Sequence, residues 1–221
     1  MADFDLCVIT RRVTRLNRGH VDVARAALNG GARLIQLREK SLPDRELWEI
    51  AQELQRLARD RGALFIVNDR PGLALAVGAD GVHLGQDDLP IAAARRILGP
   101  DAVIGASVAD EQEAKAAEEQ GATYVSVGSV FATTSKPDAG EAIGIAPIAE
   151  IGRATQLPVI AIGGINEGNV AAVIRGGAHG VAVISAVAEA EDMVEATSAL
   201  LRLIREARRS TGEEEQDHDT A

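Results

Sequence analysis

The sequence predicts a single (β/α)₈ TIM barrel over residues 1–209, followed by a disordered acidic tail over residues 210–221. Eight short apolar segments recur along the chain, and the segments between them have apolar residues at helical spacing. Glycine suits the left-handed position that ends many helices, so a glycine between the two patterns predicts a return from helix to strand. Five phrases have this form: GGARLIQL, RGALFIV, VGADGVHL, QGATYVSV and GGAHGVAV. Continuously apolar strands that alternate with helices indicate a parallel sheet covered by helices.

The five glycine phrases supply five of the expected strands, and FDLCVIT, DAVIGAS and LPVIAIGG supply the first, fifth and seventh. In chain order the strands are expected near residues 4–10, 33–38, 63–68, 80–85, 102–107, 123–128, 157–163 and 179–185. The clearest helix covers 43–59, where one face carries Leu47, Ile50, Ala51, Leu54, Leu57 and Ala58. Eight such units predict a closed barrel. The alternative is a doubly wound open sheet, which more often has fewer strands, and no Gly-x-Gly-x-x-Gly turn follows the first strand.

The bulk composition fits one domain with a sizeable core, since the 221 residues are 46% apolar and 25% charged. No apolar run approaches the roughly 18 residues that span a bilayer. Asp3 and Asp5 stand where a signal peptide would carry basic residues. We therefore expect a cytoplasmic protein without a membrane partner. The single cysteine, Cys7, lies in the first apolar segment and is interpreted as a core residue.

The charge balance argues against a nucleic-acid partner. Lys plus Arg total 23 against 33 Asp plus Glu, the net charge is −10, and aromatic residues make up 2% of the chain. A nucleic-acid binder needs a basic surface and stacking rings. The tail contains no Lys or Arg and carries five acids: Glu213, Glu214, Glu215, Asp217 and Asp219. It is predicted to be disordered and solubilising.

Polar residues and glycines follow most of the strands, where the loops of this fold build active sites. They are Gln36, Arg38 and Lys40 after the second strand, Asn68 and Asp69 after the third, Asp88 after the fourth, Ser107 at the fifth, Thr133, Thr134, Ser135 and Lys136 after the sixth, and Gly164, Ile184 and Ser185 after the last two. A lone Arg or Asp at a strand end is more often part of a rim salt bridge than a ligand. The convergence of so many polar residues nevertheless predicts a binding site.

The composition of this rim suggests anionic ligands. Arg38, Lys40 and Lys136 supply positive charge, and the hydroxyl groups after the sixth strand supply donors. The glycines after the seventh strand and the Ile184-Ser185 turn lie where barrels of this kind commonly hold a phosphate. The rim has more cations than one anion needs. We therefore infer two anionic groups, one at the last two strands and one near the second, third and sixth.

Two carboxylates, Asp69 and Asp88, are expected at the ends of adjacent strands in this cationic rim. Mg²⁺ favours one or two carboxylates together with phosphate oxygens, so the pair is a candidate metal site. The alternative is that both acids pair with Arg38 and Lys40, and the residues alone leave the two interpretations even. His83 lies inside the fourth strand and is interpreted as an orienting or core histidine. His20 is placed at the opposite, helix-to-strand side of the barrel.

From residue 4 to about residue 205 the chain resembles thiamine-phosphate synthases. The resemblance is carried in order by QLREK, FIVNDR, DGVHLGQDD, IGAS, YVSVGSVFATTSKPDAG, PVIAIGGI and GVAVISAV. It implies a transferase that condenses 4-amino-2-methyl-5-hydroxymethylpyrimidine diphosphate with a thiazole phosphate, giving thiamine phosphate and diphosphate in thiamine biosynthesis. Both substrates are small molecules, and a homo-oligomer is compatible with the resemblance.

The resemblance also implies roles for individual residues. Gln36 would contact the pyrimidine, and Asp69 and Asp88 would hold Mg²⁺. The diphosphate substrate would meet Arg38, Lys40, Asn68, Ser107 and Lys136, of which Arg38, Lys40, Ser107 and Lys136 are the predicted catalytic residues. The thiazole phosphate would meet Thr133, Ser135, Gly164, Ile184 and Ser185.

One departure from the family pattern separates two enzyme functions. A histidine commonly follows the serine of IGAS by two positions, both in this family and in the related thiazole tautomerases, and here Ala109 stands there. Only proton transfer needs an imidazole, so this change weakens the tautomerase alternative most. A non-catalytic thiazole- or thiamine-phosphate binding protein is the other alternative. Retention of the predicted diphosphate and metal residues argues against both.

Overall fold

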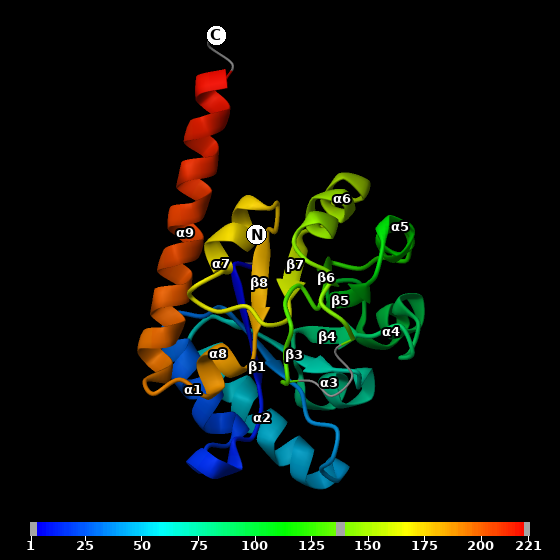
Figure 1. The fold of residues 1–221 in the computed structure, drawn as a ribbon. Coiled ribbons are helices and arrows are strands. Elements are labelled where there is room, and N and C mark those ends of the chain that lie inside the picture. Colours follow the sequence, from blue (N-terminus) through cyan, green and yellow to red (C-terminus); the bar gives the residue numbers. More distant parts are fainter. Residues whose placement is uncertain (1–3, 136–139, 219–221) are drawn as a thin grey trace.

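The computed structural model describes residues 4–135 and 140–218, with side chains described up to residue 210, and its eight parallel strands close into a barrel (Figure 1). The strands are β1 (Leu6–Thr10), β2 (Leu34–Leu37), β3 (Leu64–Asn68), β4 (Gly81–Leu84), β5 (Val103–Val108), β6 (Tyr124–Val127), β7 (Val159–Ile162) and β8 (Gly180–Val183). Each strand pairs with the next along the chain, and β8 pairs with β1 at the register Leu6–Val181. The predicted closed barrel is confirmed, and the open-sheet alternative is excluded.

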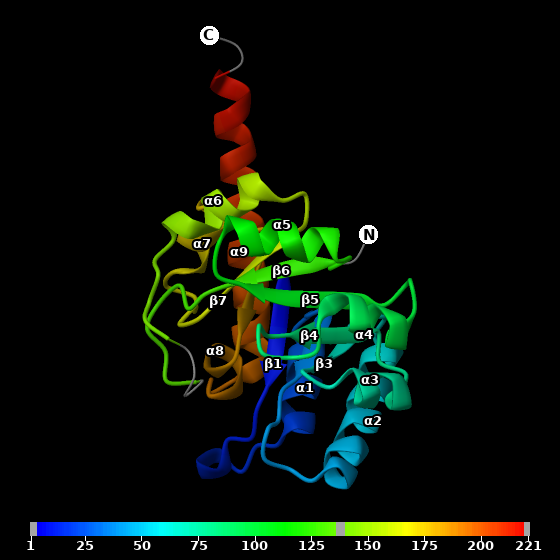
Figure 2. The same ribbon diagram turned by 90° about the vertical axis from the view of Figure 1, so that its right-hand side faces the viewer.

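Helices surround the barrel on its outside (Figures 1 and 2). They are η1 (Thr14–Leu16), α1 (His20–Asn29), α2 (Asp44–Asp60), α3 (Pro71–Val77), α4 (Ile91–Leu98), α5 (Glu111–Glu119), α6 (Ala146–Ala154), α7 (Val170–Arg175), α8 (Ser185–Ala188) and α9 (Met193–His218). The predicted helix 43–59 corresponds to α2, which buries Leu47, Ala51, Leu54 and Ala58 on one face. Each of the five glycine phrases contains a glycine with positive φ, from 60° at Gly62 to 100° at Gly177. The phrases therefore mark helix-to-strand junctions as predicted.

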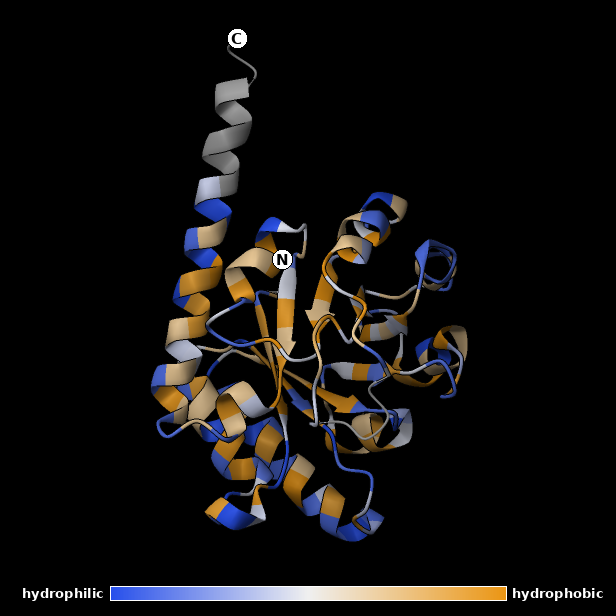
Figure 3. Cartoon of the chain, viewed as in Figure 1, coloured by the Kyte–Doolittle hydropathy of each residue, from blue (hydrophilic) through white to orange (hydrophobic). Residues whose placement is uncertain are grey.

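The sheet separates two apolar layers. One layer fills the barrel and includes Cys7, Ile66 and Tyr124, and the larger layer lies between the sheet and the helices. Strands that face both layers must be apolar on both sides, which explains their continuous apolar pattern. Figure 3 shows the same pattern as hydrophobic strands at the centre of a molecule with more polar outer helix faces. Cys7 is buried, as expected for a core residue.

The last helix continues beyond the predicted domain boundary at residue 209. α9 contacts α1 and α7, and Ala207 is the last buried residue whose side chain is described. The helical backbone runs on to His218, whereas the sequence predicts disorder from residue 210. Glu and Gln have high helix propensity, so a helix already nucleated by packing continues through Glu213–Gln216 at little free-energy cost. Residues 219–221 of the tail lie outside the described residues. Over the part of the chain that the structure describes, no helix combines the length and apolar content needed to cross a membrane.

Deleting residues 211–221 is expected to leave the fold and the activity nearly unchanged. The core-facing side of α9 ends at Ala207, so the deletion removes no buried apolar surface described in the structure. The melting temperature should stay within about 2 °C of the full chain, because loss of 1 kcal/mol from a domain of this size shifts it by about that amount. Differential scanning calorimetry and turnover measure the two effects. A changed molecular mass in solution would contradict this prediction by showing that the tail docks between subunits.

Candidate functional site

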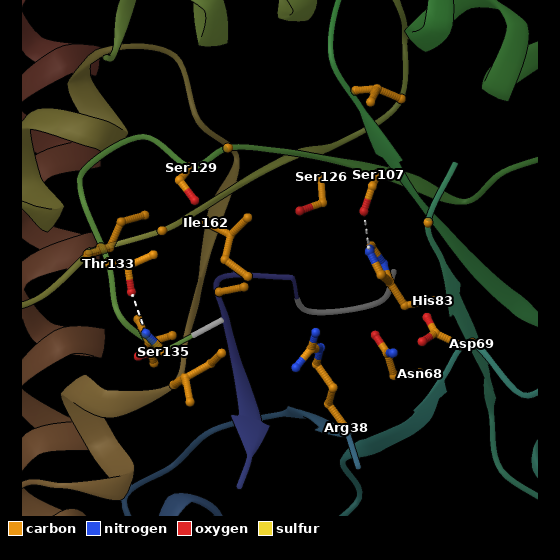
Figure 4. Close-up of a pocket in the computed structure, with 18 of the residues that line it drawn as sticks. Arg38, Asn68, Asp69, His83, Ser107, Ser126, Ser129, Thr133, Ser135 and Ile162 are labelled. Atoms are coloured by element: carbon orange, nitrogen blue, oxygen red, sulfur yellow. Dashed lines mark hydrogen bonds between the residues drawn. The ribbon is translucent and has the colours of Figure 1, made fainter. Parts of the chain in front are cut away.

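A cavity of about 360 Å³ opens at the carboxyl ends of the strands (Figure 4). It is lined by Arg38, Lys40, Asn68, Asp69, His83, Gly85, Gln86, Asp87, Asp88, Ser107, Val108, Ala109, Ser126, Gly128, Ser129, Thr133, Ser135, Ile162, Gly163, Gly164, Ile165, Ala182, Val183, Ile184 and Ser185. A second hollow adjoins it and shares Thr133, Ser135, Gly164 and Ser185. The lining residues come from the ends of β2 to β8 and the loops after them, so residues distant in sequence meet at one rim.

Eleven of the residues predicted to form the site line this cavity. They are Arg38, Lys40, Asn68, Asp69, Asp88, Ser107, Thr133, Ser135, Gly164, Ile184 and Ser185. Two others do not. Gln36 is only 3% exposed, and its side chain interacts with Tyr124 in the barrel interior. Lys136 lies outside the described residues, so its predicted role stays a prediction.

The two predicted metal ligands form a strained acid pair beside Lys40. Asp69 has φ 63°, a left-handed conformation that residues other than glycine seldom adopt and that concentrates at functional sites. Lys40 Nζ lies 3.5 Å from Asp69 Oδ2, and Asp88 Oδ2 accepts a 2.7 Å hydrogen bond from the Gly85 amide. Burial and the adjacent Asp88 carboxyl raise the pKa of Asp69 to about 6, against the opposing effect of Lys40.

This acid pair fits a hard divalent cation. Burial and the neighbouring Asp88 carboxyl raise the pKa of Asp69 and so disfavour its ionised form, and a bound cation relieves this electrostatic cost. Within residues 4–135 and 140–218 the structure has no cluster of three or more His, Cys, Asp or Glu side chains arranged for a metal. Asp69 and Asp88 therefore supply too few ligands for an all-protein site. The pair suits Mg²⁺ held partly by ligand oxygens and water.

His20 lies on the same side of the barrel as the cavity, so its predicted place on the opposite side is wrong. The residue begins α1, and a helix that follows a strand starts at the carboxyl end of the sheet. The His20 ring contacts Thr10 Oγ1 at 2.9 Å and Glu39 Oε2 at 3.3 Å. Glu39 also accepts hydrogen bonds from the amide and hydroxyl of Ser41. These contacts fix the segment between β2 and α2 that carries Arg38 and Lys40.

Burial and hydrogen bonds set the charge states of His20 and Glu39. It lowers the pKa of His20 against the opposing effect of Glu39, which favours a neutral imidazole at physiological pH. For Glu39, burial acts to raise the pKa, but hydrogen bonds from Ser41 and His20 prevail and lower it to about 2. Glu39 therefore stays ionised as an acceptor near neutral pH, so the contacts that hold the segment persist there.

Hydroxyl groups and glycines form the wall at β6 to β8. Ser135 Oγ lies 3.1 Å from Ser185 Oγ, which brings the loop after β6 against the start of α8. Gly164 has φ 63°, and a Cβ atom there would lie 2.6 Å from the Ala132 carbonyl oxygen. Only glycine permits both this conformation and this close approach. The wall therefore brings hydroxyl groups from two loops beside exposed backbone.

Sequence reasoning missed Ser126 as a cavity residue. Ser126 lies within β6, opposite Ser107 of β5 in the sheet register, and both serines line the cavity. The single serine inside the otherwise apolar strand YVSV could have indicated this position, because a buried polar group is normally hydrogen-bonded or has a functional role. Ala109 also lines the cavity, and its amide donates a 2.8 Å hydrogen bond to Glu113. A side chain at position 109 would therefore be at the site, as the tautomerase comparison assumes.

The family model described as thiamine monophosphate synthase matches residues 6–187. The chain is 54% identical over 200 residues to a thiamine-phosphate synthase of Roseiflexus sp. (strain RS-1), covering 90% of this chain and 85% of that protein. It is 49% identical over 208 residues to one from Moorella thermoacetica, covering 94% and 99% of the two chains. The solved structure of a thiamine phosphate pyrophosphorylase from Pyrococcus furiosus is similar with a TM-score of 0.84 and 46% identity, over 92% of this chain and 96% of that one.

Proposed function

Because the chain belongs to the thiamine monophosphate synthase family and acts as a thiamine-phosphate synthase, we propose that the cavity holds its two substrates side by side. The diphosphate of the pyrimidine substrate lies among the residues after β2 to β5. The phosphate of the thiazole lies at the hydroxyl and glycine wall after β6 to β8. The observation that supports this arrangement is the presence in one cavity of an acid–cation cluster at one end and a hydroxyl–glycine wall at the other.

The reaction breaks the bond between the pyrimidine methylene carbon and the diphosphate oxygen, and the thiazole nitrogen forms the new bond to that carbon. Diphosphate leaves with the electron pair of the broken bond. Arg38, Lys40 and Lys136 bind its negative charge, and Asn68 and Ser107 donate hydrogen bonds to it. Preorganised charge of this kind lowers the barrier without any covalent bond to the protein. The thiazole phosphate is held by the side chains of Thr133 and Ser135 and by backbone groups of Gly164, Ile184 and Ser185, which aim the ring nitrogen at the methylene carbon.

Asp69 and Asp88 are the residues that would hold Mg²⁺ in this proposal. When bound, Mg²⁺ neutralises charge that develops on the leaving diphosphate. Lys40 contacts Asp69 and so lies where it can share the same diphosphate. Gln36 does not line the cavity, and its predicted contact with the pyrimidine stays a prediction. The cytoplasmic location and the homo-oligomer stay predictions.

Mg²⁺ affinity in the presence of inorganic diphosphate is expected to fall as the pH drops below about 6. The pKa of Asp69 is raised to about 6, so the folded protein holds this proton more tightly than the unfolded chain. Above about pH 6 the ionised Asp69 therefore lowers the free energy of unfolding. This destabilisation disappears as the carboxylate becomes protonated at lower pH. The metal requires the ionised carboxylate, and it must displace the proton at lower pH. Isothermal titration calorimetry at pH 5 and pH 7.5 measures the difference. The same affinity at both pH values would contradict the assignment of Asp69.

The assay that tests the function combines both substrates with and without Mg²⁺ and measures thiamine phosphate through its fluorescent oxidation product. We expect thiamine phosphate and diphosphate to form in equal amounts, and to form only with the metal. A non-catalytic binding protein would bind the thiazole phosphate and release no diphosphate.

The wild-type protein is expected to show no tautomerase activity above the solution rate. Isomerising a thiazole carboxylate phosphate needs a proton-transfer group at the ring, and Ala109 has none. The change Ala109→His should leave synthase turnover within about tenfold, which corresponds to about 1.4 kcal/mol in the barrier. Strong tautomerase activity in the wild type, without diphosphate release from the synthase substrates, would overturn this prediction and make His83 the candidate base.

A further inference from the structure

A series of interacting polar side chains crosses the barrel below the cavity and ends at Ser107. The Gln36 side chain of β2 interacts with the hydroxyl of Tyr124 of β6 and acts to lower the pKa of that hydroxyl. The Tyr124 hydroxyl lies 2.9 Å from Nδ1 of His83 on β4, and His83 Nε2 lies 3.1 Å from Ser107 Oγ on β5. Figure 4 shows the last contact at the cavity wall. Gln36, Tyr124 and His83 are all less than 9% exposed, so their polar groups need partners within the protein.

The packing holds this series in one geometry. A Cβ atom at Gly105 would lie 2.1 Å from Cζ of Tyr124 and 2.5 Å from Nδ1 of His83, so the glycine leaves the space in which the two rings meet. The rings are stacked with centroids 5.6 Å apart, and Phe4 packs on Tyr124 at 5.2 Å. A ring confined on both sides keeps its hydroxyl aimed at one acceptor.

The position of each proton determines which side chain donates and which accepts along this series. Burial, with a contribution from Cys7, raises the pKa of Tyr124 well above 10, so the phenol keeps its one proton. Gln36 opposes this shift, which is the effect of an amide that donates to the phenol oxygen. The Tyr124 proton is therefore available for His83 Nδ1. With Nδ1 as acceptor, the imidazole carries its proton on Nε2 and donates it to Ser107 Oγ.

We propose that His83 is a positioning residue that makes Ser107 present its hydroxyl proton, not a lone pair, to the cavity. Ser107 accepts from His83 and thus directs its own proton elsewhere, toward the space it shares with Arg38 and Asn68 (Figure 4). In the other tautomer Ser107 would donate to His83 and turn a lone pair toward the anion. An anionic diphosphate binds the first arrangement better. The inference rests on the proposed function, because that function places diphosphate at Ser107.

The first test measures the tautomer directly and needs no turnover. Two-bond ¹H–¹⁵N spectra of histidine-labelled protein distinguish a proton on Nδ1 from one on Nε2, and the spectrum of His83→Gln identifies the His83 signals. We expect the Nε2 proton in the wild type and loss of this preference in Tyr124→Phe. Phe4→Leu is the matched control, since it loosens the packing around Tyr124 and keeps the hydroxyl. It should lower the melting temperature and leave the tautomer unchanged. A proton on Nδ1 in the wild type would overturn the proposal.

The second test asks whether Tyr124 acts through Ser107. We expect Tyr124→Phe and Ser107→Ala each to weaken the binding of inorganic diphosphate with Mg²⁺ by about tenfold, the range of one hydrogen bond to a charged group. The double variant should bind no more weakly than Ser107→Ala alone, because coupled residues are not additive. The change His83→Gln keeps a donor near the Nε2 position and should bind more tightly than His83→Leu. Additive losses in the double variant, or equal binding by the two His83 variants, would reduce His83 to a core residue.

These measurements separate the inference from the function beneath it. Absence of thiamine phosphate in the assay, together with normal diphosphate binding and the Nε2 tautomer, would remove the proposed function and leave the positioning role. Normal synthesis of thiamine phosphate together with the Nδ1 tautomer would remove the positioning role of His83 and leave the proposed function.

Discussion

Asp88→Asn is expected to lower turnover by about two to three orders of magnitude while the thiazole phosphate still binds. The asparagine retains an oxygen that can accept the Gly85 amide, so the loop after β4 should keep its shape. What is lost is one of the two charges that we propose hold Mg²⁺ against diphosphate. Turnover and the affinity for the thiazole phosphate, measured separately, distinguish loss of the metal site from loss of the fold.

Asp87→Asn is the matched control, because it removes the same charge from the neighbouring residue of the same loop. Asp87 also lines the cavity, but it is not one of the two proposed metal ligands. We expect a change of less than about threefold, the scale of a screened surface charge. Unchanged turnover in Asp88→Asn, or full wild-type activity in excess chelator, would contradict the metal assignment.

The fold was predictable because its determinants are local. Each strand is buried on both faces, so it appears as a continuous apolar run, and most returns from a helix use a glycine with positive φ such as Gly62 or Gly177. The rim was predictable for a related reason. Parallel strands bring all their carboxyl ends to one edge, and residues after β2, β3 and β4 meet there whatever their separation in the chain. The position of His20 could have been derived from the same topology.

The errors and omissions concern directions that depend on distant partners. Gln36 and Arg38 are two residues apart, yet Arg38 lines the cavity and Gln36 points to Tyr124 across the barrel. No local pattern places a β6 phenol beside a β2 amide. The left-handed conformation of Asp69 is another case, because residues other than glycine seldom adopt it and the sequence Asn68-Asp69-Arg70 does not indicate it.

Gly164→Ala is expected to raise the Michaelis constant for the thiazole phosphate by about a hundredfold, the effect of a misplacement of about 1 Å at a binding site. The new Cβ would lie 2.6 Å from the Ala132 carbonyl oxygen and 2.8 Å from Cβ of Phe131. Contacts this short force the loop after β6 to move, and that loop carries Thr133 and Ser135. Affinity for inorganic diphosphate should fall much less, since all of its proposed binding residues except Lys136 follow other strands.

Gly78→Ala separates this steric effect from backbone strain. Gly78 has φ 66°, close to the 63° of Gly164, but a Cβ atom there would meet nothing within 4 Å. Its position before β4 places it at the end of the barrel away from the cavity. The control should lose about 1 kcal/mol of stability from the left-handed conformation alone and keep both Michaelis constants. If both variants raise the constant for the thiazole phosphate equally, the effect comes from general destabilisation. If only Gly164→Ala raises it, the thiazole phosphate binds where the loops after β6 and β7 meet, because that contact is the feature the two glycines do not share.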